Sequence, residues 1–380
     1  MSFAPAPDPP TLLGRYRRLS PKAGVHVSPI AIGTMSLGTN WPAVGSCEKD
    51  AAFRYLDAYF DAGGNFVDTC NNYQGGQSEE WLGEWMEKRG NRDQIVLATK
   101  YSGAWKQGDP NVSQHPAFIG NSVKSMMVSV EASLKKLKTS YIDILYVHFW
   151  DWTTSVEEIM NGLHTLIAQG KVLYLGASNL PAFIVAKANQ YARDHGRAEF
   201  VIYQGEWNVL SRDVERDTLP LCRLDGMAFT NWNIFRMGHL RTDAEEEERE
   251  KSGKNGRQGF APSWKRSDDE KKVCAVLEKI GQEVGTKNIR AVAIAYHLRK
   301  QPYVFPMVGG NKVEQLQSNI EALGLDLTDE HVKEIESAAS FDIGYPIKYI
   351  GTGAARHLNL QAVMKYDVDP LPAAIGPLKQ

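Results

Sequence analysis

Residues 142–203 read IDILYVHFWDWTTSVEEIMNGLHTLIAQGKVLYLGASNLPAFIVAKANQYARDHGRAEFVIY. Three short, nearly continuous apolar runs are separated by two longer segments in which apolar residues recur three and four positions apart. The runs are 142–147, 172–177 and 200–203, and the segments are 156–168 and 181–195. Continuous apolar runs are typical of parallel strands buried on both faces, and the longer spacing is helical. This stretch therefore predicts strand, helix, strand, helix, strand.

The same alternation extends in both directions along the chain. Further strands are expected at residues 29–33, 65–69, 95–99, 227–230 and 303–307, and further helices at 48–62, 78–88 and 123–137. Eight strands that alternate with helices indicate an α/β protein whose strands close into a (β/α)8 TIM barrel.

The remaining segments are interpreted as additions to one barrel over residues 14–340. Residues 1–13 lack the positive start and apolar core of a secretory signal, so we expect a disordered lead-in. Residues 16–19 and 26–27 flank a Pro-Lys-Ala-Gly turn and predict a hairpin that covers the barrel floor. Residues 241–259 are highly charged, which indicates a solvated loop or a short charged helix. The tail, 341–380, is expected to pack on one end of the barrel.

The composition favours small-molecule partners. The 380 residues carry 43 basic and 45 acidic side chains, a formal charge of −2, which provides no basic field for nucleic acid or an anionic membrane. No apolar run is long enough to span a bilayer, and the cytoplasm is the expected compartment. The four cysteines are far apart and contain no CxxC pair, so we predict packing cysteines, no disulfide framework and no metal site.

Polar side chains stand at the ends of the predicted strands. In a barrel these ends form the catalytic mouth. Taken singly, each has an ordinary structural explanation as a helix cap, a core histidine or a solvated lysine. The barrel brings them to one rim, and they are Asp68 with Tyr73, Lys100, His148, Ser178 with Asn179, and Gln204.

Four of these side chains together fit carbonyl reduction. A phenol with a pKa near 10 is a weak acid at neutral pH. The ammonium of Lys100 favours the phenolate of Tyr73 and should lower its pKa, while Asp68 holds that ammonium charged. His148 can bond the carbonyl oxygen and stabilise its developing negative charge. The hydride must come from a nicotinamide cofactor, because no side chain donates hydride.

Six motifs resemble the aldo-keto reductase superfamily in residues and in order. They are IGTM at 32–35, FVDTCNNY at 66–73, ATKY at 98–101, LYVH at 145–148, GASN at 176–179 and YQGEWN at 203–208. The chain looks most like the branch of fungal aryl-alcohol dehydrogenases and norsolorinic acid reductases. The resemblance implies a catalytic tetrad of Asp68, Tyr73, Lys100 and His148, with Tyr73 as proton donor.

The resemblance also implies a site for NADP(H). Ser178, Asn179 and Gln204 match the residues that hold the nicotinamide carboxamide, and Trp232 matches the aromatic residue that stacks on the ring. The segment FPMVGGNK at 305–312 resembles the grip on the adenosine 2′-phosphate, and amides at a helix start suit an anion. The remaining cofactor candidates are Gly33, Thr34, Asp68, Asn233, Phe235, Arg236, Gly309, Gly310, Lys312, Gln315 and Asn319.

One loop departs from the family pattern. A glycine-rich turn is expected after Trp232, but residues 233–238 read NIFRMG. Side chains then stand where the backbone would approach a pyrophosphate, and Arg236 is expected to compensate by offering its charge. The change also keeps open a second function, a cofactor-binding regulatory subunit with low turnover, like the potassium-channel β subunits of this superfamily.

The predicted substrate is an aromatic aldehyde or ketone, or the corresponding alcohol. Aromatic residues are frequent near the predicted strand ends, which suits flat aryl compounds. The substrate-binding candidates are Tyr73, Trp105, His148 and Phe149. The sequence specifies neither the compound, nor the direction of the reaction, nor the oligomeric state.

Two further patterns are interpreted as coincidences. Tyr296 and Lys300 form YxxxK, the pair of short-chain dehydrogenases, but no glycine-rich turn follows the first strand, so an ordinary helix face is expected. Gly33 and Gly38 have P-loop spacing without the required lysine, so nucleotide hydrolysis is not expected.

Overall fold

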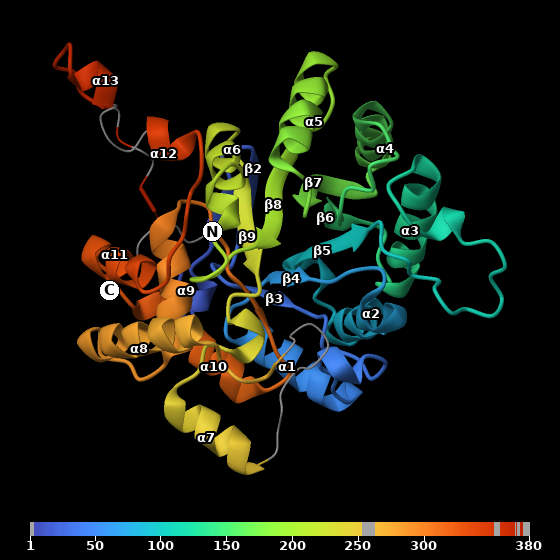
Figure 1. Cartoon of the computed structure of the whole chain (residues 1–380). Coiled ribbons are helices and arrows are strands. Elements are labelled where there is room, and N and C mark those ends of the chain that lie inside the picture. Colours follow the sequence, from blue (N-terminus) through green and yellow to red (C-terminus); the bar gives the residue numbers. More distant parts are fainter. Residues whose placement is uncertain (1–3, 253–262, 353–357, 369, 371–372, 375–380) are drawn as a thin grey trace.

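A barrel of parallel strands forms the centre of the molecule. The computed structural model describes all residues except 1–3, 253–262, 353–357, 369, 371–372 and 375–380. Its eight-stranded sheet has the order β10-β3-β4-β5-β6-β7-β8-β9, with helices around the outside (Figure 1). The strands are β3 Ala31–Gly33, β4 Phe66–Asp68, β5 Val96–Tyr101, β6 Ile142–Val147, β7 Val172–Ser178, β8 Phe200–Glu206, β9 Ala228–Trp232 and β10 Met307–Gly309. The predicted (β/α)8 fold is confirmed.

One helix follows each strand from β4 to β8, three helices lie between β9 and β10, and four follow β10 among the described residues. The helices are α1 Lys49–Asp61, α2 Gln77–Arg89, α3 Val123–Lys136, α4 Val156–Ala168, α5 Ala182–Asp194, α6 Thr218–Leu224, α7 Asp243–Ser252, α8 Asp268–Glu283, α9 Ile289–Lys300, α10 Val313–Ile320, α11 Asp329–Ser337, α12 Ile347–Ile350 and α13 Leu358–Gln361. Side-chain caps explain several starts: Ser155 accepts from the Glu158 amide before α4, and Ser267 forms a capping box with Glu270 at α8.

The barrel closes at a seam between β9 and the segment before β10. The expected eighth strand at 303–307 is displaced, because β10 pairs with β3 only from Met307 onward. Val304 instead forms a single parallel bridge to Phe229 of β9. The Phe229 amide donates to Tyr303 O at 2.9 Å, and the Phe305 amide donates to Phe229 O at 2.9 Å. The extended segment 303–309 therefore bonds first to β9, through residues 303–305, and then to β3, through residues 307–309.

An N-terminal hairpin closes the barrel floor. β1 Arg17–Ser20 pairs antiparallel with β2 Ala23–Val27, as predicted, around a tighter turn than expected. Leu19, Ala23 and Val27 are buried in one cluster with Phe66 and Ile144 from inside the barrel. This end is therefore filled with apolar side chains, which leaves the opposite end for chemistry.

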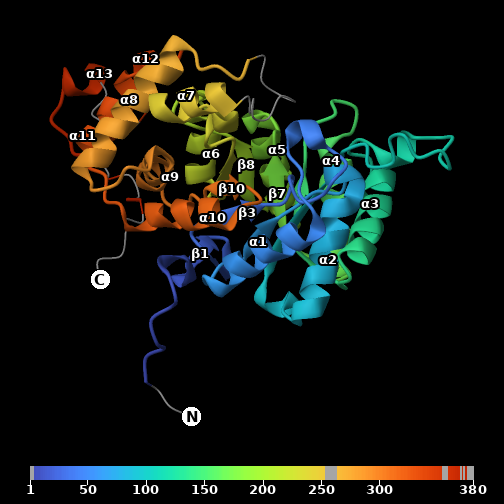
Figure 2. The ribbon, with the colours of Figure 1, turned by 90° about the horizontal axis from the view of Figure 1, so that it is seen from below.

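The segments outside the barrel differ in detail from expectation. Packed structure begins before residue 14, because Leu13 is fully buried within the 3-10 helix Leu12–Gly14. The first described residues, 4–8, extend away from the barrel (Figure 2). Part of the charged segment forms helix α7, which has no buried residue. Arg241, two residues before this helix, is buried, and residues 253–259 lie outside the described residues.

The C-terminal segment begins by contacting the connection between β8 and α6. Phe341 lies under the guanidinium groups of Arg212 and Arg216. Further along, Tyr345 and Tyr349 are exposed, and α13 lies away from the barrel in Figure 1. Within the described residues, no helix is both long and apolar enough to cross a membrane.

The YxxxK pair is structural, as predicted. Tyr296 and Lys300 lie on α9, where both bond Glu336 of α11, at 3.0 and 2.5 Å. They link α9 to α11.

Candidate active site

The carboxyl ends of neighbouring strands bring four polar side chains together. Asp68 ends β4 and Lys100 lies near the end of β5, while His148 directly follows β6. Tyr73 begins the 3-10 helix Tyr73–Gly76, which follows β4. The parallel register places β4, β5 and β6 side by side. Asp68 and Lys100 are each only 1% exposed, so the barrel interior separates them from solvent.

Lys100 connects the other polar groups. Its Nζ donates to the Asp68 carboxylate in a buried ion pair, to Thr69 O at 2.8 Å and to Tyr73 Oη at 3.5 Å. The second Asp68 oxygen accepts from Gln204 Nε2 at 3.0 Å. Gln204, which we expected at a carboxamide, therefore anchors the buried carboxylate in this structure.

The charges of this cluster follow from burial and pairing. Burial disfavours the ammonium, but the Asp68 carboxylate and Tyr73 outweigh it and hold the pKa of Lys100 above its ordinary value. Burial raises the pKa of the Tyr73 phenol, and Lys100 acts in the opposite direction without overcoming that effect. The expected effect of Lys100 on the phenol pKa is therefore present, but the expected net lowering is not, because burial has the larger effect. The phenol keeps its proton and is available as a proton donor.

His148 faces Tyr73 as a neutral ring. The two ring centroids lie 6.2 Å apart, edge to face. Burial, with a smaller contribution from the Lys100 charge, lowers the pKa of His148 to about 3. A neutral imidazole donates one hydrogen bond and accepts another, so His148 can orient a carbonyl group beside the phenol.

Sequence reasoning missed a second buried ion pair, which supports the loop that carries Tyr73. Glu79 at the start of α2 pairs with Lys136 Nζ at 2.5 Å, and it accepts from Thr99 Oγ1 at 2.6 Å. Lys136 Nζ also donates to Asn71 O at 3.0 Å, and it lies 5.4 Å from the centre of the Trp105 ring. No sequence signal distinguished this glutamate from an ordinary acidic residue in a first helical turn.

We expect Glu79→Gln to lower the free energy of unfolding by about 3–5 kcal/mol, because it leaves Lys136 largely buried without its counter-charge. Urea unfolding followed by circular dichroism measures the change. Glu87→Gln is the matched control on the same helix, because the Glu87–Lys138 pair is exposed and its loss should leave the free energy of unfolding nearly unchanged. Equal, small losses in the two variants would contradict the structural role of Glu79.

Side chains suited to a nicotinamide carboxamide lie next to the catalytic cluster. Asn179 follows β7 with a left-handed φ of 53°. Its Nδ2 donates to Ser178 Oγ and to His148 O, both at 3.1 Å, and its Oδ1 accepts from Trp232 Nε1 at 3.3 Å. Amide, hydroxyl and indole groups thus meet at the ends of β7 and β9.

The ends of β3 and β10 flank this cluster on the other side. Gly33 is the last residue of β3, and the Thr34 amide donates to Asp68 O at 2.9 Å. The Thr34 hydroxyl is buried and has no hydrogen-bond partner among the described residues. Thr34 stays a predicted cofactor-binding residue.

The predicted phosphate segment forms the start of a helix. Gly309 ends β10, and Gly310 and Asn311 lead to Lys312, the N-cap of α10. The Lys312 side chain is exposed, and within the described part of the chain it makes no hydrogen bond or ion pair. Gln315 is exposed on α10, and Asn319 is buried. Free amides and an unpaired ammonium are a suitable donor set for a phosphate.

Three residues of the loop after β9 have a left-handed backbone although they are not glycines. Asn233, Arg236 and Met237 have φ values of 60°, 50° and 53°, a left-handed conformation that glycine adopts most easily. The Asn233 side chain stabilises this turn, because its Oδ1 accepts from the Met237 amide at 2.7 Å. Phe235, between them, packs against the apolar cluster that contains Leu37 and Ile234.

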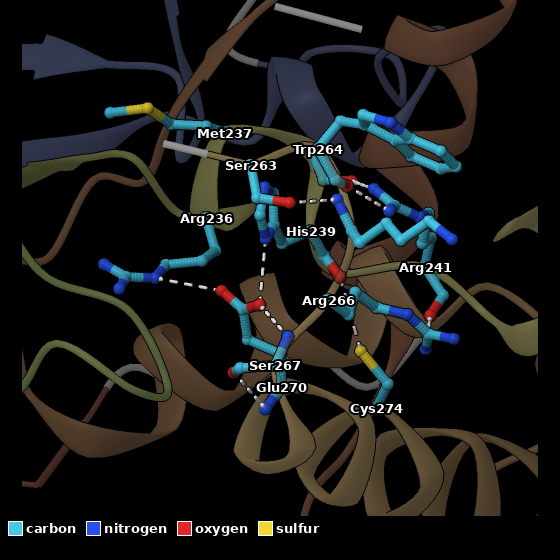
Figure 3. Close-up of polar contacts among 12 residues, drawn as sticks. Arg236, Met237, His239, Arg241, Ser263, Trp264, Arg266, Ser267, Glu270 and Cys274 are labelled. Carbon is cyan, nitrogen blue, oxygen red and sulfur yellow. Dashed lines mark hydrogen bonds and ion pairs between the residues drawn. The ribbon is translucent and has the colours of Figure 1, made fainter. Parts of the chain in front are cut away.

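Arg236 is already engaged by neighbouring groups. It donates to Ser211 Oγ at 2.9 Å and to Glu270 Oε1 at 3.4 Å, and it lies 3.6 Å from Glu206. Figure 3 shows Arg236 and His239 both directed at Glu270, whose other oxygen is 2.9 Å from His239 Nδ1. Burial raises the pKa of Glu270, but the hydrogen bonds from His239 and from the Ser267 amide outweigh this effect and lower the pKa to about 2. Arg236 therefore shares its charge with Glu206 and Glu270, and its expected role at a pyrophosphate stays a prediction.

Aromatic side chains surround part of the mouth, and others belong to the core. Trp41 lies edge-on to Tyr73 at 6.4 Å, and Phe149 lies 6.2 Å from the His148 ring. Trp105 packs edge-on against Phe118 in the following loop. Trp207, by contrast, is fully buried. The aromatic residues that follow the predicted strands therefore include some at the mouth of the barrel and others in its core.

Comparison with known proteins gives matches over almost the whole chain. The model of the Aldo/keto reductase family matches residues 29–340. The chain is 52% identical to an aryl-alcohol dehydrogenase [NADP(+)] of Phanerodontia chrysosporium over 382 residues, 99% of each protein. It is 48% identical to norsolorinic acid reductase A of Aspergillus parasiticus, over 92% of this chain and 87% of that protein. It is 45% identical to the aldo-keto reductase ausK of Aspergillus calidoustus, over 93% of this chain and 89% of that protein.

Proposed function

Because the chain belongs to the aldo/keto reductase family, we propose that it reduces aryl aldehydes or ketones to alcohols, and oxidises the alcohols in reverse, with Tyr73 as proton donor. Membership in this family and the NADP(+)-dependent relative make the chain an NADP(H)-dependent oxidoreductase. The observation that carries the finer proposal is the convergence of Asp68, Tyr73, Lys100 and His148 at one end of the barrel.

The side chains around this cluster fit a nicotinamide dinucleotide. Asn179, Ser178 and Trp232 provide polar groups and an aromatic face beside His148. The amides at the start of α10 and the unpaired Lys312 offer an anion site at the neighbouring strand end. When bound there, NADPH supplies the hydride for carbonyl reduction.

The roles of the chain's own groups follow from their contacts. Tyr73 keeps its proton and donates it to the carbonyl oxygen as negative charge develops there. Lys100, held charged by Asp68, stabilises the phenolate that remains. His148, as a neutral ring, bonds the same oxygen and directs it toward Tyr73.

The aromatic surroundings favour an aryl substrate over an aliphatic one. Trp41 and Phe149 each contact one of the two groups that would bond the carbonyl oxygen. A ring attached to the carbonyl would therefore lie among aromatic faces. The relatives include an aryl-alcohol dehydrogenase and norsolorinic acid reductases, and their names agree with this preference.

A panel of aldehydes tests the proposal. Oxidation of NADPH and of NADH is followed at 340 nm with benzaldehyde derivatives and with aliphatic aldehydes of similar size. We expect turnover with NADPH and a higher kcat/KM for the aryl compounds. Tight NADPH binding without turnover on any aldehyde would support the low-turnover regulatory function instead, and preference for aliphatic aldehydes would exclude the aryl assignment.

Lys312→Ala tests the assignment of the 2′-phosphate site. The ammonium should contribute a charge-assisted contact of roughly 1.5–3 kcal/mol to NADPH and almost nothing to NADH. We therefore expect the preference for NADPH to fall by about one to two orders of magnitude, through affinity more than turnover. Fluorescence titration with each cofactor measures the two Kd values.

The exposed Lys287, which precedes α9, provides a control of the same charge change. Lys287→Ala should leave the ratio of the two Kd values unchanged. If Lys312→Ala weakens both cofactors equally, the phosphate site lies elsewhere.

A further inference from the structure

The thiol of Cys70 contacts the imidazole of His148. Cys70 is fully buried, two residues after Asp68 and three before Tyr73. Its Sγ lies 3.2 Å from His148 Nδ1. The sulfur also lies 3.1 Å from Asn72 Oδ1, 3.4 Å from Asn71 Oδ1 and 3.7 Å from Lys100 O. The sequence predicted a packing cysteine, and the structure adds a polar contact to a member of the catalytic cluster.

The protonation states of the two groups make Cys70 a hydrogen-bond donor. Burial raises the pKa of the thiol to about 12, although Lys100 opposes this effect. The thiol therefore keeps its hydrogen at neutral pH. The imidazole is neutral at the same pH, as described above, so only one of its two nitrogens carries a hydrogen.

The single thiol hydrogen has several acceptors to choose from. An imidazole nitrogen is more basic than an amide or peptide oxygen, so it forms the strongest bond with this weak donor. Nδ1 then accepts, and the ring hydrogen must reside on Nε2. The hydrogen bond made by one ring nitrogen determines the state of the other.

We propose that Cys70 is a positioning residue that holds His148 in the tautomer with hydrogen on Nε2, so that this edge of the ring donates to the substrate carbonyl oxygen. The expected effect on catalysis rests on the proposed function, whereas the tautomer of His148 does not. The contact itself is a property of this chain's residues. The opposite arrangement, with Nδ1–H donating to sulfur, leaves Nε2 as an acceptor that repels the carbonyl oxygen.

Nitrogen NMR of the imidazole side chains distinguishes the two tautomers directly. The protein is labelled with ¹⁵N-histidine, and the signals of His148 are identified by their absence from His148→Gln. We expect the native protein to show Nε2 protonated and Nδ1 unprotonated between about pH 6 and pH 8. In Cys70→Ala we expect the ring hydrogen of His148 to be distributed between Nε2 and Nδ1, because Nδ1 no longer accepts a hydrogen bond from the thiol.

Kinetics with benzaldehyde connect the tautomer to the reaction. Cys70→Ala should lower kcat about tenfold, comparable to losing a partner that orients a metal-bound histidine, while the Kd for NADPH stays within about twofold. Cys70→Ser keeps a donor at this position and should restore the Nε2–H tautomer and most of kcat. Cys222→Ala, a buried thiol on α6, is the control and should change neither measurement.

Two results overturn the proposal. One is a native His148 that carries its hydrogen on Nδ1, and the other is an unchanged tautomer in Cys70→Ala. The NMR measurement needs no substrate, so it remains decisive even if no aldehyde is reduced, an outcome that would refute the proposed function alone.

Discussion

Tyr73→Phe is expected to lower kcat for carbonyl reduction about 100-fold or more, the usual scale of losing a general acid. The loss follows from the surroundings, because neither neighbour can replace the phenol. His148 has a pKa lowered to about 3 and carries no acidic imidazolium at neutral pH, and Lys100 is held charged by Asp68. Single-turnover reduction of benzaldehyde with bound NADPH measures the step without product release.

The binding of NADPH should be nearly unchanged in Tyr73→Phe, since the phenol acts on the carbonyl oxygen. Tyr303→Phe is the matched control. Its phenol accepts from Arg18 at 2.9 Å near the barrel floor, and its loss should leave kcat within about twofold. Full turnover in Tyr73→Phe would mean that another group delivers the proton.

Lys100→Met is expected to damage both catalysis and stability. The phenolate loses its stabilising charge, so kcat should fall at least as far as in Tyr73→Phe. Asp68 is left as a buried carboxylate without its partner, which costs about 3–5 kcal/mol of unfolding free energy. Asp68→Asn combined with Lys100→Met removes both charges, and this double variant should be more stable than the single one.

The destabilisation of Lys100→Met should depend on pH in a definite direction. Without Lys100, burial raises the pKa of Asp68 above its unfolded value near 4. The folded state then binds more protons than the unfolded state, so stability falls as pH rises between these two values. Urea unfolding at about pH 4.5 and pH 8 should therefore show the larger deficit at pH 8. An equal deficit at both values would mean that the carboxylate is not left uncompensated.

The fold was predictable because local and global signals agree. The nearly continuous apolar run at 142–147 is typical of a parallel strand with both faces covered, and this segment forms β6 with the predicted boundaries. The last strand was displaced for a reason that no periodicity contains. Residues 303–305 bond to β9 and residues 307–309 to β3, so one apolar run serves two neighbours.

Proximity of the catalytic candidates was predictable from topology, but their energetics were not. The rule that strand ends meet at one rim placed Asp68, Lys100 and His148 together. The pKa of Tyr73 depends on how deeply the phenol is buried, which residue types do not reveal. The same holds for Glu79 and Cys70, whose partners, Lys136 and His148, are distant in sequence.

The seam of the barrel has a consequence for how the molecule fluctuates. β8 and β9 share five paired positions, whereas β9 meets the next segment through the single bridge at Val304. Amide hydrogens at this junction should exchange with solvent sooner than those of β6 or β7, because local opening starts where few bonds must break. Trp232 and Lys312 lie on opposite sides of the junction. A dinucleotide bound by both residues would bridge β9 and β10, oppose this local opening and slow the exchange of the amide hydrogens there.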